Sequence, residues 1–124
     1  MGILIDTDVL IEYLRGNEAV VNKLSALYNN GEELCYSPVT RAEIIAGLRK
    51  GEEEITSRLF SLMECFNIDD DTGHKAGEYM KRFRASHMVE IADALIAATV
   101  HSQGVTLWTF NRKHYPMKDI EFYG

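Results

Sequence analysis

Short apolar segments alternate along the chain with longer segments whose apolar residues recur at helical spacing. The short runs are rich in β-prone residues and predict strands. They are GILI at 2–5, ELCY at 33–36, CFNI at 65–68, TLWT at 106–109 and IEFY at 120–123. Strands separated by helices are typical of a parallel sheet with helices on both faces. The pattern therefore predicts an α/β fold with a central, mainly parallel sheet of four to five strands.

Two of the intervening segments carry a clear apolar helical face. The first face comprises Val20, Val21, Leu24, Leu27 and Tyr28, and the second comprises Tyr79, Met80 and Phe83. Glycine favours the left-handed conformation that ends many helices. We therefore expect helices to end at four dipeptides: Arg15-Gly16, Asn30-Gly31, Lys50-Gly51 and Gln103-Gly104.

Length and composition indicate one globular domain spanning residues 1–124. Hydrophobic residues make up 46% and charged residues 26% of the 124, which is ordinary for such a domain. No apolar run approaches the roughly 20 residues that span a bilayer. The opening MGILIDTD has no basic region ahead of its apolar residues. We expect no signal peptide, no membrane association and a cytoplasmic location.

The charge balance is acidic, with a formal net charge of −6. This argues against a protein that coats nucleic acid nonspecifically, because such proteins are normally basic. It does not exclude an enzyme whose acids gather at a metal site. The two cysteines, Cys35 and Cys65, lie in apolar contexts without zinc-ligand spacing, so we expect reduced, buried thiols.

Acidic residues stand where the first two strands end. In sheets of this type ligands bind beyond the carboxyl ends of the strands. Asp6 ends the first strand and is a candidate site residue, whereas Asp8 is explained as well by the first turn of a helix. After the second strand, Ser37 and Pro38 predict a helix start. Thr40 and Glu43 also match a capping box, but if Ser37 is the cap, Glu43 is free for a site.

Asp93 is the one carboxylate within the apolar segment IADALIAATV at 91–100. A helix starting near Glu90 would stabilise it through the helix dipole by only about 0.3–1 kcal/mol. Burying an uncompensated ion costs several kcal/mol. If the apolar residues around it pack, namely Ile91, Ala92, Leu95 and Ile96, Asp93 needs a cation. No Lys or Arg lies between positions 90 and 103.

Polar residues also follow the third and fourth strands. Asp69, Asp70 and Asp71 most simply solvate a loop and cap the next helix. Asn111 follows the fourth predicted strand and is a further site candidate, although Asn is also common in turns. The cluster at 112–114, Arg-Lys-His, is a solvated surface or, as a secondary interpretation, a phosphate-binding edge.

Four segments thus bring oxygen-bearing side chains to one edge of the predicted sheet: Asp6, Glu43, Asp93 and Asn111. Close carboxylates repel one another unless they are protonated or neutralised by a metal. Oxygen ligands suit Mg²⁺ or Mn²⁺, which bind substrate phosphates and activate water for hydrolysis. The joint pattern indicates metal-dependent phosphodiester hydrolysis.

The sequence resembles the PIN-domain family, specifically the VapC-type toxin ribonucleases, over nearly its whole length. ILIDTDVLIEYLRG resembles the opening motif, SPVTRAEIIAGL the Thr-x-x-Glu segment, IADALIAAT the third acidic motif and TLWTFNRKHY the closing motif. The resemblance implies an α/β/α sandwich and an endoribonuclease dependent on Mg²⁺ or Mn²⁺. It also implies a homodimer and a cognate antitoxin whose C-terminal segment occupies the site.

The resemblance implies roles for individual residues. Asp6, Glu43 and Asp93 become the principal acids and the metal ligands, and Thr40 would orient ligands or water by hydrogen bonding. Asn111 takes the fourth position, where Asp is also common in the family, so its metal role stays open. Asp8 falls near the site at a position that varies in the family and is secondary.

Two other functions fit parts of the pattern. In a haloacid-dehalogenase-type phosphatase Asp6 would be the nucleophile and Asp8 the general acid, but no paired-acid motif with a suitable glycine follows late in the chain. In a non-catalytic receiver domain Asp6 and Asp8 would bind Mg²⁺ and one of 69–71 would accept phosphate, but no Lys ends the last strand. A degenerate PIN module that only binds a partner is a third possibility.

Overall fold

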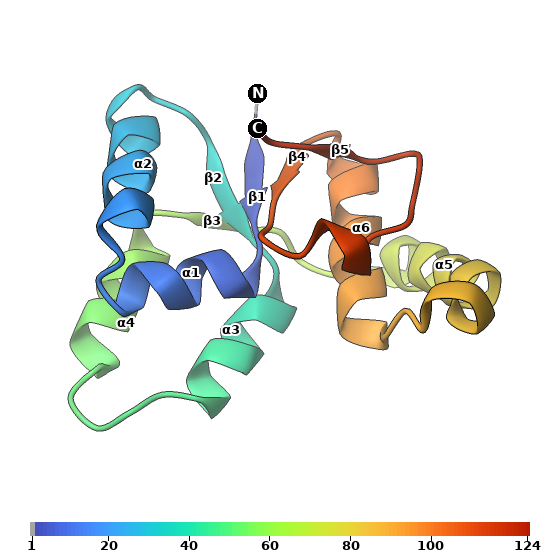
Figure 1. Cartoon of the computed structure of the whole chain (residues 1–124), viewed down its shortest axis with the longest axis horizontal. Helices are drawn as coiled ribbons and strands as arrows, with labels where there is room; N and C mark the ends of the chain where they lie inside the picture. Colours follow the sequence, from blue (N-terminus) through green and yellow to red (C-terminus); the bar gives the residue numbers. More distant parts are fainter. Residues whose placement is uncertain (1) are drawn as a thin grey trace.

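A five-stranded parallel sheet forms the centre of the molecule in this computed structural model, which describes residues 2–124. The strand order is β3-β2-β1-β4-β5, and every pairing is parallel (Figure 1). The strands are β1 (Ile3–Ile5), β2 (Leu34–Tyr36), β3 (Glu64–Cys65), β4 (Thr106–Trp108) and β5 (Glu121–Phe122). The predicted fold class is confirmed.

Helices cover both faces of the sheet and make three layers (Figure 1). The helices are α1 (Thr7–Leu14), α2 (Glu18–Asn29), α3 (Pro38–Ala46), α4 (Glu53–Ser61), α5 (Asp70–His87) and α6 (Ile91–Gln103), with a short 3₁₀ helix η1 at Arg112–His114. Helices α5 and α6 pack against each other on one side, and α1, α2 and α4 lie on the other. None of the helices in residues 2–124 is long and apolar enough to cross a membrane.

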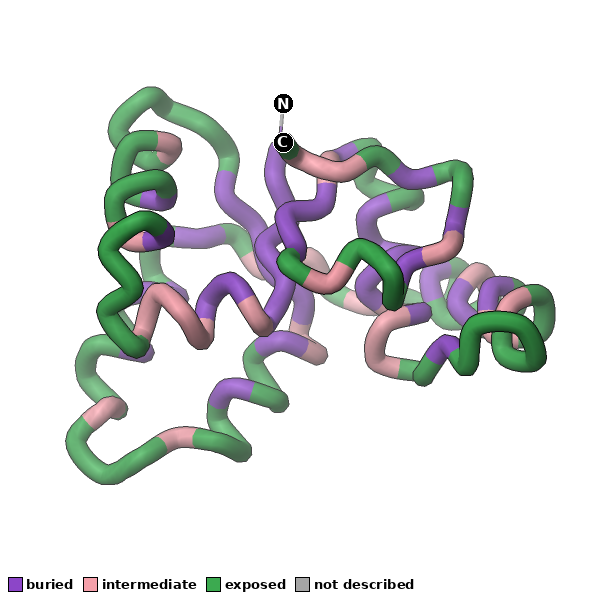
Figure 2. Tube along the Cα trace, in the orientation of Figure 1, coloured by how far each residue is buried: buried purple, intermediate pink, exposed green. Residues whose placement is uncertain are grey.

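Two hydrophobic cores result from the alternation of side chains along the strands. In β1, Leu4 faces the core built with α5 and α6, while Ile3 and Ile5 face the core built with α1, α2 and α4. Figure 2 shows the buried residues concentrated along the strands and the inner sides of the helices. Strand β1 is therefore buried on both faces, as expected of a central parallel strand.

The strand order predicts where a ligand would bind, because the order reverses between β1 and β4. From β1 the chain proceeds outward to β2 and β3, and β4 then returns to the opposite side of β1. In open parallel sheets the crevice lies at such a reversal, beyond the carboxyl ends of the two strands. Here the reversal falls between β1, which runs into Asp6, and β4, which runs into Thr109.

The predicted element boundaries agree in most places and fail in two. The predicted helix ends at Gly16, Gly31 and Gly104 are confirmed, each glycine having a φ between 64° and 80°. The predicted helix end at Lys50-Gly51 is wrong, because α3 already ends at Ala46 and Gly51 lies in the turn before α4. The third strand was expected at 65–68 but is Glu64–Cys65, since Asp69 begins to cap α5.

Both cysteines are free thiols, as expected. Cys35 is fully buried, whereas Cys65 is only partly buried. Burial, together with the nearby charges of Glu64 and Glu33, raises the pKa of the Cys35 thiol to about 12. A thiol with such a pKa is protonated at neutral pH and is a packing residue.

Candidate active site

Asp6 stands at the end of β1 and holds one fixed orientation. It is the N-cap of α1, and its Oδ1 accepts a hydrogen bond from the backbone N–H of Thr7 at 2.8 Å. Its Oδ2 accepts two more, from the hydroxyl of Thr109 at 2.8 Å and from the hydroxyl of Tyr115 at 2.8 Å. With 7% of its surface exposed, Asp6 is a buried carboxylate whose direction is set by three donors.

Asp93 lies in the first turn of α6 and reaches the same phenol. Its Oδ1 is 3.3 Å from the hydroxyl oxygen of Tyr115, and its Oδ2 is 3.7 Å from Nδ1 of His114. Burial and the nearby charge of Asp6 raise the pKa of the Asp93 carboxyl above its ordinary value. Asp6 and Asp93, which are far apart in the sequence, therefore contact the same hydroxyl group, that of Tyr115.

The expected packing around Asp93 is only partly correct. Ile96 is buried as predicted, and Ala92 and Leu95 are half-buried, but the prediction that Ile91 packs is wrong because 62% of it is exposed. Ile91 is the first residue of α6, where the helix projects beyond the sheet. The side chain of Asp93 is 25% exposed, so one edge of the carboxylate faces solvent.

The phenol of Tyr115 has one proton for two carboxylates. The hydroxyl donates to Asp6 Oδ2 at 2.8 Å and makes a longer, weaker hydrogen bond to Asp93 Oδ1 at 3.3 Å, so the two carboxylates share one phenolic proton. Burial, followed by the charges of Asp6 and Asp93, raises the pKa of Tyr115. The hydroxyl therefore stays protonated, and it can donate to either carboxylate.

Glu43, on α3, is connected to the site by a hydrogen bond from Thr7. Ser37 caps α3 by accepting from the backbone N–H of Val39 at 3.1 Å, and Thr40 and Glu43 lie one turn apart inside the helix. The Thr7 hydroxyl donates to Glu43 Oε1 at 2.7 Å and lies 3.0 Å from Thr40 Oγ1. The alternative capping box of Thr40 and Glu43 is thus not formed, and Glu43 lies next to the residue that follows Asp6.

Asp8 organises the segment that follows β4. Its Oδ2 accepts from the backbone N–H of Phe110 at 3.1 Å and from Asn111 Nδ2 at 2.9 Å. Its Oδ1 is buried and has no hydrogen-bond partner. Burial, followed by the charge of Asp6, raises the pKa of Asp8 to about 6. Asp8 is therefore more than a first-turn acid, because it holds Asn111 at the site.

Three residues at this site were not singled out from the sequence: Thr7, Thr109 and Tyr115. Thr7 directly follows Asp6, and Thr109 lies two residues before Asn111. Their hydroxyls donate to Glu43 and Asp6, respectively. Their proximity in sequence was a usable signal. Tyr115 lies just past the basic cluster, and nothing in its local pattern distinguishes it from a core aromatic residue.

The residues of the basic cluster at 112–114 have different roles: Arg112 binds the chain end, and His114 lies near the acids. The Arg112 guanidinium donates to the backbone carbonyls of Tyr123 at 3.2 Å and Gly124 at 2.6 Å. Arg112 thus ties η1 to the chain end, and the secondary interpretation as a phosphate-binding edge is not supported for it. His114 lies beside Asp93. Asp69 caps α5 by accepting from Thr72, as expected.

The donor set fits a divalent cation in chemistry and charge. The acids are hard oxygen ligands, the carboxyls of Asp8 and Asp93 both have raised pKa values, and Asp8 Oδ1 is a buried oxygen without a partner. Within residues 2–124 no three His, Cys, Asp or Glu side chains already converge at coordinating distance. Coordination would therefore require side-chain rotation, for which the partly exposed Asp93 and exposed Glu43 have room.

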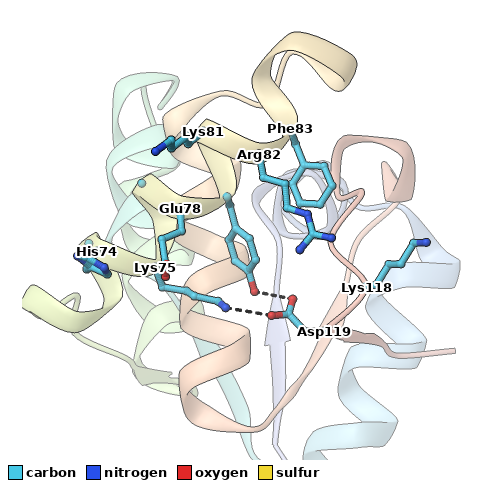
Figure 3. Close-up of a pocket in the computed structure, with 11 residues that line it drawn as sticks. His74, Lys75, Glu78, Lys81, Arg82, Phe83, Lys118 and Asp119 are labelled. Carbon is cyan, nitrogen blue, oxygen red and sulfur yellow. Dashed lines mark hydrogen bonds and ion pairs between the residues drawn. The ribbon is translucent and has the colours of Figure 1, made fainter.

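A pronounced surface groove lies away from these acids. It follows α5 and the segment before β5, with a volume of about 1120 Å³ (Figure 3). Asp119 lines the groove. Its carboxylate accepts a hydrogen bond from the Tyr79 hydroxyl at 2.7 Å and forms an ion pair with Lys75 at 3.1 Å. None of the five predicted site residues lines this groove.

Comparisons with known proteins identify the family and the fold. The family model described as "PIN domain" matches residues 3–120. A Mycobacterium tuberculosis protein named "Ribonuclease VapC19" is 36% identical over 115 residues, covering 92% of each chain. The structure of VapBC2 from Rickettsia felis bound to a promoter DNA fragment has a TM-score of 0.83 at 21% identity, covering 99% of this chain and 98% of that one.

A second solved structure has a similar fold. It is described as a toxin-antitoxin complex from Klebsiella pneumoniae and has a TM-score of 0.77 at 22% identity. The match covers 96% of this chain and 95% of that one. The similarity therefore extends over the whole sheet and its helices.

Proposed function

The chain belongs to the PIN-domain family, and on that premise we propose that it is a divalent-metal-dependent endoribonuclease, the toxin of a toxin–antitoxin pair. The observation that carries the proposal is the meeting of Asp6 and Asp93 at the reversal of the sheet, with Glu43 and Asn111 anchored to either side. The name of the M. tuberculosis relative, a ribonuclease, supports the substrate class.

The residues have separate roles in this proposal. Asp6, Glu43 and Asp93 hold Mg²⁺ or Mn²⁺. Thr40 orients the Glu43 carboxylate indirectly, because both residues contact the Thr7 hydroxyl. Asn111, held by a hydrogen bond to Asp8, contributes a neutral amide in place of a fourth acid. The neutral amide lowers the negative charge that a substrate phosphate meets, which favours binding of a polyanion.

The chemistry needs little beyond these groups. A divalent cation supplies charge neutralisation and a bound water of lowered pKa at such a site. Asp6, fixed by three hydrogen bonds, provides a rigid edge, whereas Asp93, which faces solvent on one side, is the acid that adapts to substrate. With water as the nucleophile, the phosphodiester would be hydrolysed without a covalent enzyme intermediate.

The other two functions fit less well. Receiver domains have the strand order 2-1-3-4-5, whereas this sheet has the order 3-2-1-4-5. For a haloacid-dehalogenase-type phosphatase, the sequence lacks a paired-acid motif with a suitable glycine late in the chain. Asp8→Ala separates the cases, because it should nearly abolish a phosphatase but leave much of the nuclease activity.

The test is RNA cleavage by purified protein freed of any partner. Total cellular RNA is incubated with Mg²⁺, Mn²⁺ or EDTA, with Asp93→Asn as the site variant and Asp71→Asn, an exposed acid of α5, as the matched control. We expect metal-dependent cuts at discrete sites for the wild type and Asp71→Asn, and none for Asp93→Asn.

Other outcomes would count against the proposal. Equal cutting by Asp93→Asn would mean that the site is misplaced or that the activity belongs to a contaminant. If neither protein cuts, Mn²⁺ binding by the wild type decides the matter, and absence of binding would refute the four-segment site.

The proposal extends to partners and location. We expect a cognate antitoxin whose C-terminal segment occupies the site, a homodimer, and action on RNA in the cytoplasm. The similar fold of the toxin-antitoxin complex from Klebsiella pneumoniae and the ribonuclease name of the M. tuberculosis relative support this expectation. Light scattering of the purified chain tests the dimer, and co-purification with the product of a neighbouring gene, with loss of RNA cleavage, tests the antitoxin.

A further inference from the structure

We propose that Tyr115 is a positioning residue, whose hydroxyl holds Asp6 and Asp93 in the mutual arrangement that binds the divalent cation. The inference rests on the proposed function, because it assigns a role within the same site. It concerns a residue that touches neither substrate nor metal and acts through the two acids.

The first support is the position of the hydroxyl. It lies 2.8 Å from Asp6 Oδ2 and 3.3 Å from Asp93 Oδ1, so a single oxygen atom contacts a carboxylate from each side of the sheet reversal. Asp6 follows β1, and Asp93 lies in the first turn of α6. No other side chain in residues 2–124 forms hydrogen bonds with both acids.

The second support is the unequal dependence of the two acids on this contact. Asp6 keeps hydrogen bonds from Thr7 and Thr109 when the phenol is removed. Asp93 has Tyr115 as its one hydrogen-bond partner among the described residues, and His114 is farther away at 3.7 Å. Without the hydroxyl, the carboxylate of Asp93 loses its tether to Asp6.

The third support is that the ring is held independently of its hydroxyl. Tyr115 is 3% exposed and belongs to the core formed with α5 and α6. Its ring lies edge-on to Phe122, with 6.5 Å between the ring centroids. Tyr115→Phe should therefore leave the ring in place and remove one oxygen atom.

The chain offers a matched control in Tyr79. Tyr79 is 4% exposed, lies in the same core and donates to a carboxylate, that of Asp119, at 2.7 Å. The dashed lines in Figure 3 mark the two interactions that reach Asp119 in the groove. Tyr79→Phe removes the same group from an equally buried tyrosine away from the acids.

The experiment measures Mn²⁺ affinity by calorimetry for the wild type, Tyr115→Phe and Tyr79→Phe, with thermal melts to verify folding. Loss of a hydrogen bond to a metal ligand lowers metal affinity by about 10- to 100-fold. We expect that loss for Tyr115→Phe and wild-type affinity for Tyr79→Phe. In RNA cleavage, Tyr115→Phe should need correspondingly more Mn²⁺ but recover most of its rate at saturation.

A readout without substitution at position 115 guards against a variant that fails to fold. In wild-type protein labelled with fluorotyrosine, Mg²⁺ should shift one of the six tyrosine resonances strongly, and that resonance should remain in Tyr79→Phe. Absence of any shift in a protein that binds Mg²⁺ would overturn the inference.

The outcomes separate this inference from the proposed function. Unchanged or tighter Mn²⁺ binding by Tyr115→Phe, or an equal loss in Tyr79→Phe, overturns the role of Tyr115 and leaves the nuclease proposal standing. No Mn²⁺ binding by the wild type overturns both.

Discussion

At the scale of single residues, the sequence leaves open whether Asp8 is only a first-turn acid of a helix or also a site residue, and the structure answers this. A first-turn acid is stabilised by the helix dipole whether or not it has another task. The structure shows that its Oδ2 also binds the backbone of Phe110 and the amide of Asn111. Asp8 therefore connects the segment after β1 with the segment after β4.

The raised pKa of Asp8 predicts a pH dependence of stability in metal-free protein. Burial and Asp6 raise this pKa from 3.8 to about 6, so the folded state binds more protons than the unfolded state between pH values of about 4 and 6. The unfolding free energy should fall as pH rises through that window, by roughly 1–2 kcal/mol from Asp8 after solvent screening. Denaturation in EDTA at pH 5 and pH 7 measures it.

Asp8→Asn is the comparison for this pH effect. The variant should show a weaker decrease in stability between pH 5 and pH 7, with a remainder from Asp93, whose pKa is also raised. An identical pH dependence in wild type and variant would contradict the assignment to Asp8.

Glu43 allows a prediction that separates activity from stability. Its side chain is exposed, so Glu43→Gln should change the unfolding free energy by less than about 0.5 kcal/mol. Loss of its charge should lower RNA cleavage by about 100-fold or more, as removal of groups acting on a reacting phosphate commonly does. Glu78→Gln, an exposed acid on α5, serves as the control and should cleave at the wild-type rate.

At the scale of elements, the start of α3 decides whether Glu43 is available. Two caps were possible from the sequence, Ser37 and Thr40. The structure has Ser37 as the cap and Pro38 as the first helical residue. Because the helix begins two residues before Thr40, both Thr40 and Glu43 present their side chains from consecutive turns toward Thr7.

Ser37→Ala tests the importance of this helix start. It removes the side-chain acceptor for the Val39 N–H and should lower the unfolding free energy by about 1 kcal/mol. Ser61→Ala is the control, since its exposed hydroxyl only donates to the Arg58 carbonyl near the end of α4. Chemical denaturation compares the two variants. Equal stability of both would show that Ser37 does not determine where α3 begins.

At the scale of the whole molecule, the reversal of strand order brings together acids more than 80 residues apart. Asp6 follows the central strand β1, and Asp93 lies in the first turn of α6, the helix that leads into the neighbouring strand β4. Each acid is partly removed from water, and each lies close to another negative group. A bound cation therefore stabilises the folded chain specifically, because the unfolded chain does not gather these acids.

Metal binding should accordingly raise the melting temperature. A ligand at about 100 times its dissociation constant adds about 2.7 kcal/mol, which corresponds to roughly 10 °C for a chain of this length. Mn²⁺ should produce such a shift in the wild type and almost none in Asp93→Asn. Calorimetric melts with and without EDTA measure it. An equal shift in both proteins would place the metal elsewhere.

The sequence by itself determined the fold class, most element positions and the helix ends at Gly16, Gly31 and Gly104. Periodicity, caps and glycine signals act over a few neighbouring residues, so they can be recognised without the fold. It misplaced the end of α3 and the third strand, where two local signals competed. Asp6, Thr40, Glu43, Asp93 and Asn111 were named as candidates, and the structure places each at or next to the sheet reversal.

Only the tertiary structure decided which side chains connect these candidates. Tyr115 is an unremarked aromatic residue in the sequence, yet its hydroxyl lies between Asp6 and Asp93. Asp8 meets Asn111 across 103 positions of the chain. Such contacts depend on strand order and on the path of the segment after β4. Local propensities do not encode either one, because both arise from packing the two cores against a shared sheet.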